Sequence, residues 1–288
     1  MSNKILVIGG GPAGLEAARS VAELGGEAIL IEKRERLGGT PDREGYAKLT
    51  HHWRDASEAM AELAASVTSS ARVEVKYNAE VKGMSGSAGN FNVEIEAGGV
   101  AESLNVGAVI VATGFQHFDP GRATQQYNYY TFPDVVTLTD LEKMLKDHHV
   151  VRPSNGEAPK KIAFIQCVGS RDRRIGNEYC SKVCCGIASK QAIELRELLP
   201  DSKVMIFYID MRMYGYWENE IYWPAQEKYK VNYVKGVISE VLKKGDQLLI
   251  RGEDTTMGRP MEVTMDMVVL SIGMEPSAGT RAIAQTLG

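Results

Sequence analysis

Cysteine is scarce in this chain of 288 residues, and its few occurrences lie together. All four cysteines fall between Cys167 and Cys185, so none is left elsewhere for a disulfide framework or for a second iron–sulfur cluster. Four thiolates are the number that one cubane iron–sulfur cluster needs. The cysteine run therefore suggests one metal site and excludes a second.

Long apolar runs and an excess of positive charge are also missing. No apolar stretch approaches the roughly 20 residues that span a bilayer. The formal net charge of −4 gives no basic surface for nucleic acid. The first residues lead directly into the apolar run Ile5–Ile8, without the leader of a secretory signal. We therefore expect a soluble cytoplasmic protein without a nucleic-acid partner or a membrane span, in which clustered cysteines more often hold metal than pair.

The N-terminal region has the order of elements that dinucleotide binding requires. Lys4–Ile8 predicts a buried parallel strand, and Leu15–Leu24 carries apolar residues at helical spacing before a Gly-Gly stop. Ala28–Ile31 predicts a second strand, which ends at Glu32. This strand, turn, helix and strand predict a Rossmann-type nucleotide site.

The glycines of the turn have separate tasks in such a site. Gly9 allows the tight turn, Gly11 lets the backbone approach the pyrophosphate, and Gly14 lets helix and strand pack closely. The start of the helix offers N–H groups to the phosphates, and Glu32 can accept a hydrogen bond from a ribose hydroxyl. The predicted cofactor contacts here are Gly9, Gly11, Pro12, Ala13, Gly14 and Glu32.

Segments downstream favour FAD over NAD as the nucleotide. Lys33 and the group Gly38, Gly39 and Thr40 extend the site beyond the acidic residue. A further strand ends in the small residues Ala112, Thr113 and Gly114. By these residues the chain resembles thioredoxin-reductase-like flavoproteins. The resemblance implies an α/β fold of two Rossmann-type, three-layer β/β/α domains, with a β-meander inserted in the first domain and backbone contacts from Val81 to adenine.

The second half of the chain lacks the glycine motif expected there. After a polar segment at 149–161, Ile162–Ile165 predicts another buried strand. In a two-domain reductase this strand would lead into a second GxGxxG for NAD(P)H, but here it leads into Cys167 and Gly169. Without the glycines, the pyrophosphate of a nicotinamide cofactor has no close backbone approach. Direct reduction by NAD(P)H is therefore disfavoured.

The spacing of the cysteines leaves several chemistries open. If Cys180–Leu199 is helical, Cys180 and Cys184 lie one turn apart on one face and Cys185 is rotated by about 100°, while Cys167 approaches from the strand end. A redox disulfide normally shows CxxC, and structural zinc prefers paired CxxC knuckles; both patterns are absent. We favour an iron–sulfur cluster over redox thiols, zinc and inert cysteines.

Several motifs resemble the A subunit of heterodisulfide reductase and its relatives over nearly the whole chain. The resemblance implies FAD and one [4Fe–4S] cluster, with Cys167, Cys180, Cys184 and Cys185 as the ligands. It also implies an oxidoreductase subunit with B- and C-like partner subunits, a homodimeric state, and a sulfur substrate on a thiol or on a protein carrier. The motifs are Cys167–Asp172, Tyr179–Cys185, Ala188–Ile193, Thr113–Pro120, Phe132–Val136, Tyr208–Gly215 and Ser271–Pro276.

The chain also departs from the methanogen type of that family. Residues 41–56 contain no cysteine, and no ferredoxin-like cysteine motif is present. These departures point to the short A-like subunits of bacterial complexes for cytoplasmic sulfur oxidation. The quinone-interacting A subunit of sulfate reducers, an NAD(P)H-dependent disulfide reductase and a flavin or cluster redox sensor remain as alternatives.

The expected domains follow from these motifs. Residues 1–148 form an FAD-binding domain, 149–161 a linker, 162–276 a second Rossmann-like domain with the cluster, and 277–288 the start of a return to the first domain. No side chain is expected to act as acid, base or nucleophile. We expect Arg171 and its neighbouring arginines to be solvated as often as functional, and His51 and His52 to be solvated or capping.

Overall fold

The structure is a computed structural model that describes residues 2–50, 52–122 and 125–287. It separates into two compact units, each with its own sheet and core. Along these ranges, every helix is too short or too polar to cross a bilayer. Unit 1 consists of Met1–Leu49, Arg54–Gln116 and Glu275–Gly288, and unit 2 of Thr50–Trp53 and His117–Met274.

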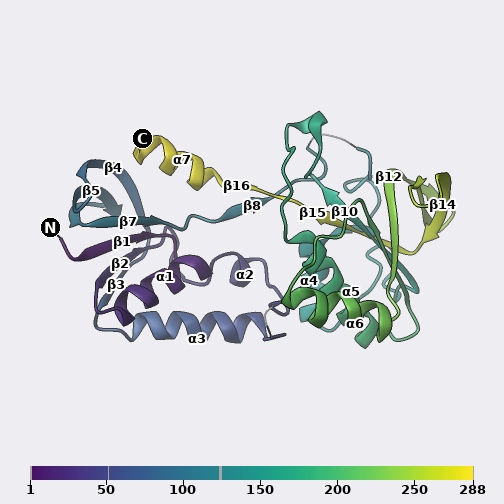
Figure 1. The fold of residues 1–288 in the computed structure, drawn as a ribbon, viewed down its shortest axis with the longest axis horizontal. Helices are drawn as coiled ribbons and strands as arrows, with labels where there is room; N and C mark the ends of the chain where they lie inside the picture. The colour runs from purple at the N-terminus through teal and green to yellow at the C-terminus, as the bar shows by residue number, and fades with distance from the viewer. Residues whose placement is uncertain (1, 51, 123–124, 288) are drawn as a thin grey trace. The chain divides into compact units, whose positions relative to one another are not determined.

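Unit 1 is built on a parallel sheet with the strand order β3-β2-β1-β7 (Figure 1). Helices α1 and α3 cover one face, where Leu15 and Val67 pack in one core with Val7 and Leu30. Pro12 opens α1, because its fixed φ suits the first helical position. The bounds are β1 Lys4–Ile8, α1 Pro12–Glu23, β2 Glu27–Ile31, α2 Gly39–Arg43, α3 Ala56–Thr68, β3 Val73–Lys76 and β7 Ala108–Val111.

A three-stranded antiparallel meander packs on the other face of this sheet. Val81 and Ile95 of the meander share a core with Ile29 and Ile31, and the last helix adds Ile283 to it. The unit thus has the predicted β/β/α layers, since strands cover one face of the sheet and helices the other. The bounds are β4 Ala79–Ser87, β5 Asn90–Ala97, β6 Val100–Val106 and α7 Ala278–Leu287.

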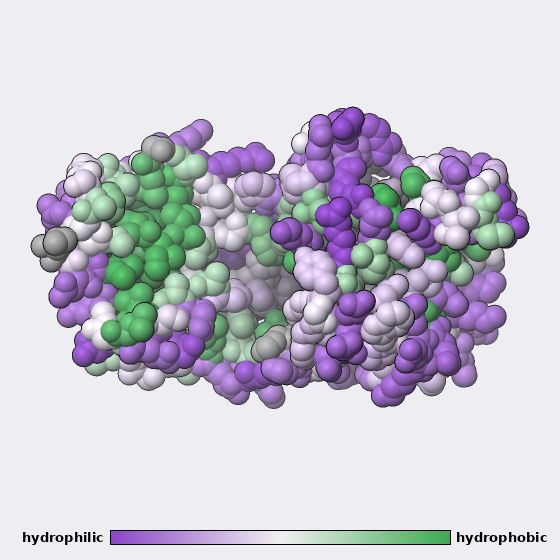
Figure 2. Space-filling model, in the orientation of Figure 1, coloured by the Kyte–Doolittle hydropathy of each residue, from purple (hydrophilic) through white to green (hydrophobic). Residues whose placement is uncertain are grey.

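Strand β7 forms the edge of the parallel sheet in unit 1. Figure 2 shows apolar side chains gathered on the surface over the strands of this unit. Val111, at the end of β7, is 46% exposed. The apolar character of the sheet therefore continues to its edge.

Unit 2 contains a seven-stranded sheet with the order β14-β13-β12-β11-β10-β15-β9. The strands from β12 to β9 run parallel, and β13 and β14 are added antiparallel. Ile250 of β13 and Met265 of β14 share a core with Ile165 and Phe207, so strands again cover one face. The bounds are β9 Val135–Thr137, β10 Lys161–Val168, β11 Lys203–Tyr208, β12 Asn232–Lys244, β13 Gln247–Asp254, β14 Arg259–Met265 and β15 Met267–Ile272.

Helices α4 (Leu138–Lys146) and α5 (Cys184–Leu198) are joined by a buried ion pair. Lys190 Nζ of α5 lies 2.6 Å from Glu142 Oε1 of α4, and both side chains are almost fully buried. Gln191 Nε2 donates to the Leu138 carbonyl oxygen at 2.9 Å. These contacts fix the position of α5, whose first two residues are Cys184 and Cys185. A short helix, α6 (Trp223–Glu227), and two single turns, η1 (Arg173–Ile175) and η2 (Glu218–Tyr222), complete the unit.

The boundary between the two units differs from the predicted one. Residues 117–122 and 125–148 fold in unit 2, although the sequence assigned them to the first domain. The reason is that β9 pairs in parallel with β15 and so completes the sheet of unit 2. Where the chain passes from unit 1 to unit 2 after β7, the boundary therefore follows residue 116 instead of residue 148.

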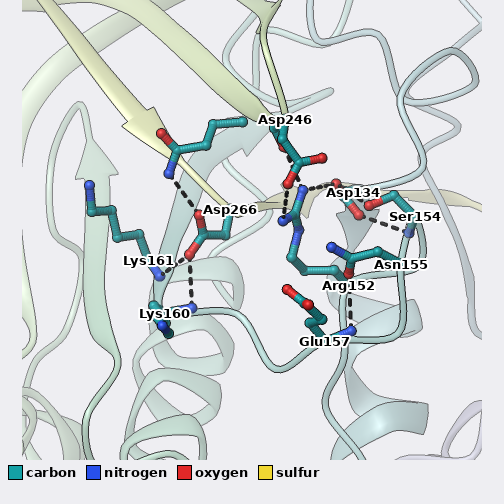
Figure 3. A network of polar contacts seen from close by, with 10 residues as sticks. Asp134, Arg152, Ser154, Asn155, Glu157, Lys160, Lys161, Asp246 and Asp266 are labelled. Atoms are coloured by element: carbon teal, nitrogen blue, oxygen red, sulfur yellow. Dashed lines mark hydrogen bonds and ion pairs between the residues drawn. The ribbon is translucent and has the colours of Figure 1, made fainter.

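The segment 149–161, predicted as a linker, begins and ends within unit 2, and Figure 3 shows polar contacts that hold it there. The Arg152 guanidinium donates to Asp134 Oδ2 and to Asp246 Oδ2, each at 2.9 Å. Arg152 and Asp134 are both buried, so this is an internal charge pair. The segment is a fixed loop of one unit and does not join two domains.

Two short strands carry the chain between the units. They are β8 (Phe115–His117) and β16 (Met274–Pro276), and they pair with each other. After β16, the chain enters α7 of unit 1.

Candidate cofactor sites

The glycine turn after β1 is closed on itself by backbone contacts. Gly9 has a φ of +111°, which favours glycine. A Cβ at Gly14 would lie 1.8 Å from the Gly9 carbonyl oxygen, so only glycine allows α1 to pack this closely on the turn. The two predicted geometric tasks of Gly9 and Gly14 thus have physical causes in the structure.

Gly11 differs, because the protein leaves space around it. A Cβ there would come no closer than 3.6 Å to the nearest atom, the Cα of Gly39. Packing therefore does not require glycine at this position, whereas a phosphate that approaches the backbone would. Gly11 is also the N-cap of α1, and it has no side chain to cap the helix. The N-terminal N–H groups of α1 can thus serve an anion.

Glu32 and the second glycine pair hold the turn from the other side. Glu32 Oε2 accepts from the backbone N–H of Gly10 at 2.7 Å, and Oε1 accepts from that of Arg34 at 3.0 Å. Each carboxylate oxygen keeps a second lone pair that a ribose hydroxyl can use. The Gly38 N–H donates to the Gly10 carbonyl oxygen at 2.9 Å, which brings the loop with Gly38, Gly39 and Thr40 against the turn.

The third predicted FAD segment lies next to the same edge of unit 1. The Ala112 N–H donates to the Ile8 carbonyl oxygen at 2.8 Å, and the Thr113 hydroxyl lies 2.8 Å from that of Thr280. Lys33 Nζ lies 4.0 Å from the position of a Cβ on Gly279 in α7. The structure therefore gathers three of the predicted segments at this edge. Val81 lies apart from them with its side chain in the meander core, and its backbone contact to adenine stays a prediction.

All four cysteines line one small cavity in unit 2, at the carboxyl end of β10. The cavity wall combines sulfur, hydroxyl and charged groups and is formed by Cys167, Ser170, Arg171, Cys180, Ser181, Lys182, Cys184, Cys185, Asp210 and Arg212. Cys184 and Cys185 are buried, and Cys167 and Cys180 are half-buried. Within the described ranges, no three His, Cys, Asp or Glu side chains are placed to hold a single metal ion.

The backbone around this cavity adopts conformations that side chains rarely favour. Cys167 has a φ of +63° at a bulge in β10, where the register with β15 shifts between Ile165 and Val168. Arg171 and Lys182 have φ values of +55° and +63°. Each such residue costs on the order of 1 kcal/mol or more, and strain of this kind gathers at functional sites. The strained residues therefore lie in the loop where the cysteines converge.

Cys180 lies in a loop, so the helical spacing considered for Cys180 and Cys184 does not apply, and the four cysteines come from a strand, a loop and a helix start. Helix α5 begins at Cys184, and the left-handed conformation of Lys182 excludes a helix before it. The Lys182 N–H instead donates to Cys180 Sγ at 3.3 Å. Cys180 and Cys184 therefore do not lie one helical turn apart; Cys180 comes from a loop, and only Cys184 and Cys185 come from α5.

Burial dominates the acid–base state of the thiols. It raises the pKa of the Cys167 thiol to about 11 and that of Cys184 to about 12, and the neighbouring cysteines add to both increases. Arg171 opposes the increase at Cys167. Without metal the Cys167 and Cys184 thiols are neutral near pH 7, so metal binding would release their protons.

Five further residues line the cavity that the sequence did not mark as site residues, although they lie within the motifs that carry the resemblance. They are Ser170, Ser181, Lys182, Asp210 and Arg212. Arg171 was expected to be solvated as often as functional, but it lines the cavity and donates to Asp210 Oδ2 at 2.8 Å. His52 lies edge-on to Tyr216, and His51 lies outside the described residues.

The comparison with known families decides the class of the protein. The pyridine nucleotide-disulphide oxidoreductase family matches residues 3–287. The chain belongs to this family. The predicted class, an oxidoreductase, is thereby confirmed.

Curated relatives in this family agree with the resemblance stated above. The chain is 31% identical over 371 aligned positions to the A subunit of the H(2):CoB-CoM heterodisulfide,ferredoxin reductase of Methanothermobacter marburgensis, covering 100% of this chain and 56% of that protein. It is 29% identical over 367 positions to the iron-sulfur A subunit of the CoB–CoM heterodisulfide reductase of Methanocaldococcus jannaschii, covering 98% and 55%. The predicted resemblance to such A subunits is confirmed, and the chain spans about half the length of the curated relatives it matches.

Solved structures confirm the predicted fold. Thioredoxin reductase of T. acidophilum matches with a TM-score of 0.58 at 17% identity, covering 97% of this chain and 80% of that chain. The enzyme of Lactococcus lactis matches with a TM-score of 0.58 at 16% identity and the same coverage. At these identities the likeness concerns the fold alone. The pyridine nucleotide-disulphide oxidoreductase family and this fold support FAD as a cofactor.

Proposed function

We propose that this chain is a cytoplasmic electron-transfer subunit of a heterodisulfide-reductase-like complex, with FAD in unit 1 and one [4Fe–4S] cluster in unit 2. The observation that carries the proposal is the convergence of all four cysteines on one cavity. This cavity lies at the carboxyl end of β10, the sheet edge at which a Rossmann-type unit holds its nucleotide.

Unit 1 would bind the pyrophosphate of FAD through its backbone. The open backbone at Gly11 and the start of α1 would take the pyrophosphate, and Glu32 would take a ribose hydroxyl. The remaining contacts are proposed for Gly9, Pro12, Ala13, Gly14, Lys33, Gly38, Gly39, Thr40, Val81, Ala112, Thr113 and Gly114. When bound, FAD accepts electrons in pairs and a [4Fe–4S] cluster accepts them singly.

Unit 2 would hold the cluster with Cys167, Cys180, Cys184 and Cys185. Four thiolates in a buried place need compensation for their charge. Arg171, Lys182 and Arg212 line the same cavity and supply positive charge there. The buried position of Cys184 and Cys185 also keeps water away from the site. The residues thus fit a charged four-cysteine group.

The partners are part of the proposal and follow from the relatives. Both reported relatives are named as A subunits of heterodisulfide reductases. We propose B- and C-like partner subunits, a homodimer of this chain, and a sulfur substrate presented on a thiol or a carrier protein. Because residues 41–56 contain no cysteine, we place the chain nearest the short bacterial subunits of sulfur oxidation, ahead of the quinone-interacting type.

An NAD(P)H-dependent disulfide reductase is the alternative that the family description favours. Against it stands the edge after β10, where Cys167 and a strained loop replace the glycine turn. The run also has no CxxC pair. A redox sensor would use the same cofactors without electron transfer to a partner protein.

The test is the cofactor content and redox behaviour of the anaerobically purified chain. We expect one FAD, about four iron atoms and four acid-labile sulfides per chain, and an EPR signal after reduction with dithionite. Protein that contains flavin but no iron, or zinc in place of iron, would overturn the cluster assignment. Rapid bleaching of the flavin by NADH without a partner would favour the reductase instead.

A further inference from the structure

Two serine hydroxyls take part in the wall of the cysteine cavity. Ser170 lies three residues after Cys167 and Ser181 directly after Cys180, and both side chains line the cavity. Both residues are buried, with exposures of 3% and 7%. Their Oγ atoms lie 2.6 Å apart, and Ser181 Oγ also accepts from the backbone N–H of Met274 at 2.9 Å. The two loops that carry Cys167 and Cys180 are therefore joined by a hydroxyl pair.

The pair has one hydrogen more than its own bonds use. Each hydroxyl carries one hydrogen, and the bond between the serines uses one of the two. The N–H of Met274 supplies its own hydrogen and only occupies a lone pair of Ser181. Whichever serine donates to the other, one hydroxyl hydrogen is left without a protein acceptor among the described residues. The remaining hydrogen is therefore carried by a buried hydroxyl group in the cavity wall.

The cavity offers few side-chain acceptors for this hydrogen. Asp210 is the one carboxylate of the described cavity wall, and it is half exposed and already bound by Arg171 at 2.8 Å. The other acceptors among these side chains are the sulfur atoms of the four cysteines. Buried hydroxyls in native proteins are almost always hydrogen-bonded, so the remaining hydrogen is available to a group that binds in this cavity.

Gly273 makes the space in which the hydroxyl pair lies. A Cβ at this position would lie 2.3 Å from Ser170 Oγ and 3.0 Å from Ser181 Oγ. Gly273 connects β15 to β16, and its N–H donates to the Val168 carbonyl oxygen at 2.7 Å. The absence of a side chain at Gly273 therefore lets both hydroxyls approach each other beside the sulfurs.

We propose that the Ser170–Ser181 hydroxyl pair donates a hydrogen bond to the sulfur atoms of the cluster site and raises the reduction potential of the cluster. The inference rests on the function proposed above, because it requires the cluster. Reduction adds negative charge to the iron and sulfur atoms, and a hydrogen bond to sulfur stabilises that charge. A site with this hydrogen bond accepts an electron more readily than the same site without it.

The test is a redox titration of the cluster in the whole anaerobically purified protein, followed by EPR. In the double variant Ser170→Ala/Ser181→Ala the midpoint potential should shift to a more negative value. Ser189→Ala is the matched control, because Ser189 is also buried in unit 2 and bonded, to the Tyr233 hydroxyl at 2.8 Å, but does not line the cavity. Its potential should equal that of the unmodified protein. Gly273→Ala keeps both hydroxyls but displaces them, and it should shift the potential in the same direction as the double variant.

A second measurement does not depend on the double variant assembling a cluster. After exchange into D₂O, pulsed EPR of the reduced unmodified protein should show an exchangeable deuteron coupled to the cluster, and this coupling should weaken in Gly273→Ala. An equal potential in all variants, or a deuteron coupling that Gly273→Ala leaves unchanged, would overturn the inference. Purified protein without iron would instead overturn the proposed function.

Discussion

The two sheet edges after β1 and β10 have the same architecture and opposite chemistry. In each, a central parallel strand leads to a helix that begins at the site, α1 in unit 1 and α5 in unit 2. The path from β1 to α1 takes three residues, all of them glycine, whereas the path from β10 to α5 takes the long loop 169–183. The first edge exposes backbone, and the second edge presents side-chain sulfur.

The comparison shows that the two edges share one property, a helix N-terminus that can stabilise negative charge. Both helices begin without a side-chain hydrogen bond to their first turn, so both N-termini can stabilise negative charge. At α1 this charge would be a phosphate, and at α5 it would be the thiolates of Cys184 and Cys185. The helix start is common to both edges, and the residues between strand and helix decide the kind of anion.

The largest expected effect is the loss of the metal without the loss of the flavin. Cys184→Ala removes a buried ligand from the cavity, and we expect the iron content to fall at least tenfold while the flavin content stays unchanged. Iron analysis and the visible spectrum of the anaerobically purified variant measure the two quantities. The control is Ser189→Ala, a small buried substitution on the same helix outside the cavity. Iron retained in full by the Cys184 variant would contradict the assignment of this edge.

The second prediction is the opposite one for the edge after β1, namely the loss of FAD without the loss of the metal. Gly14→Ala would place a Cβ 1.8 Å from the Gly9 carbonyl oxygen and so force α1 away from the turn. We expect loss of most of the FAD with full retention of iron, measured as flavin and iron per chain. Gly11→Ala tests ligand binding more directly, because its Cβ would come no closer than 3.6 Å to a protein atom and so should not disturb the fold. It should leave the unfolding temperature of the flavin-free protein unchanged and still weaken FAD binding; unchanged affinity would show that no ligand approaches Gly11.

The sequence allowed the elements of both edges to be predicted because their signals are local. The run Lys4–Ile8, the glycines after it and the position of Glu32 all lie within one strand–helix–strand unit, and the structure has them as predicted. The cysteine run is local in the same sense. The positions of Cys167 at the end of a strand and of Cys184 near the start of a helix could be predicted from local patterns.

The errors and omissions come from contacts between distant segments. Strand β9 belongs to unit 2 because it pairs with β15, more than 100 residues later, and nothing in Val135–Thr137 itself indicates that partner. One omission is local: the residue type of Lys182 does not signal its left-handed conformation, which precedes the start of α5 at Cys184. The hydroxyl pair depends on the missing side chain at Gly273, again about 100 residues away.

A smaller effect should distinguish the stability of the two units. Arg152→Ala removes the partner of buried Asp134 in unit 2 and leaves that carboxylate without its counter-charge. Breaking a buried ion pair on one side typically costs about 3–5 kcal/mol. Denaturant unfolding can be followed separately by flavin fluorescence for unit 1 and by the cluster absorbance for unit 2. The free energy of unfolding should fall for the transition seen by the cluster absorbance only. The control is Arg251→Ala, which removes an arginine from exposed ion pairs of the same unit. Equal losses in Arg152→Ala and Arg251→Ala would contradict the importance of burial here.

The smallest expected effect is a pH dependence confined to unit 2. Burial opposes ionisation of Asp266, but hydrogen bonds from Gln247 and from the N–H groups of Lys160 and Lys161 outweigh it and lower the pKa of this carboxyl below its ordinary value (Figure 3). Because the folded pKa lies below the unfolded one, the stabilisation is present above the ordinary carboxyl pKa of about 4 and is lost as the pH falls through the folded value. Asp266→Asn should cost on the order of 1 kcal/mol at pH 7 and progressively less in acid, so the two unfolding curves should approach each other as the pH falls. Urea unfolding between pH 7 and pH 3 measures this, with the exposed Asp201→Asn as the control. A difference between Asp266→Asn and the unmodified protein that stays constant over this range would show that the carboxyl charge does not contribute.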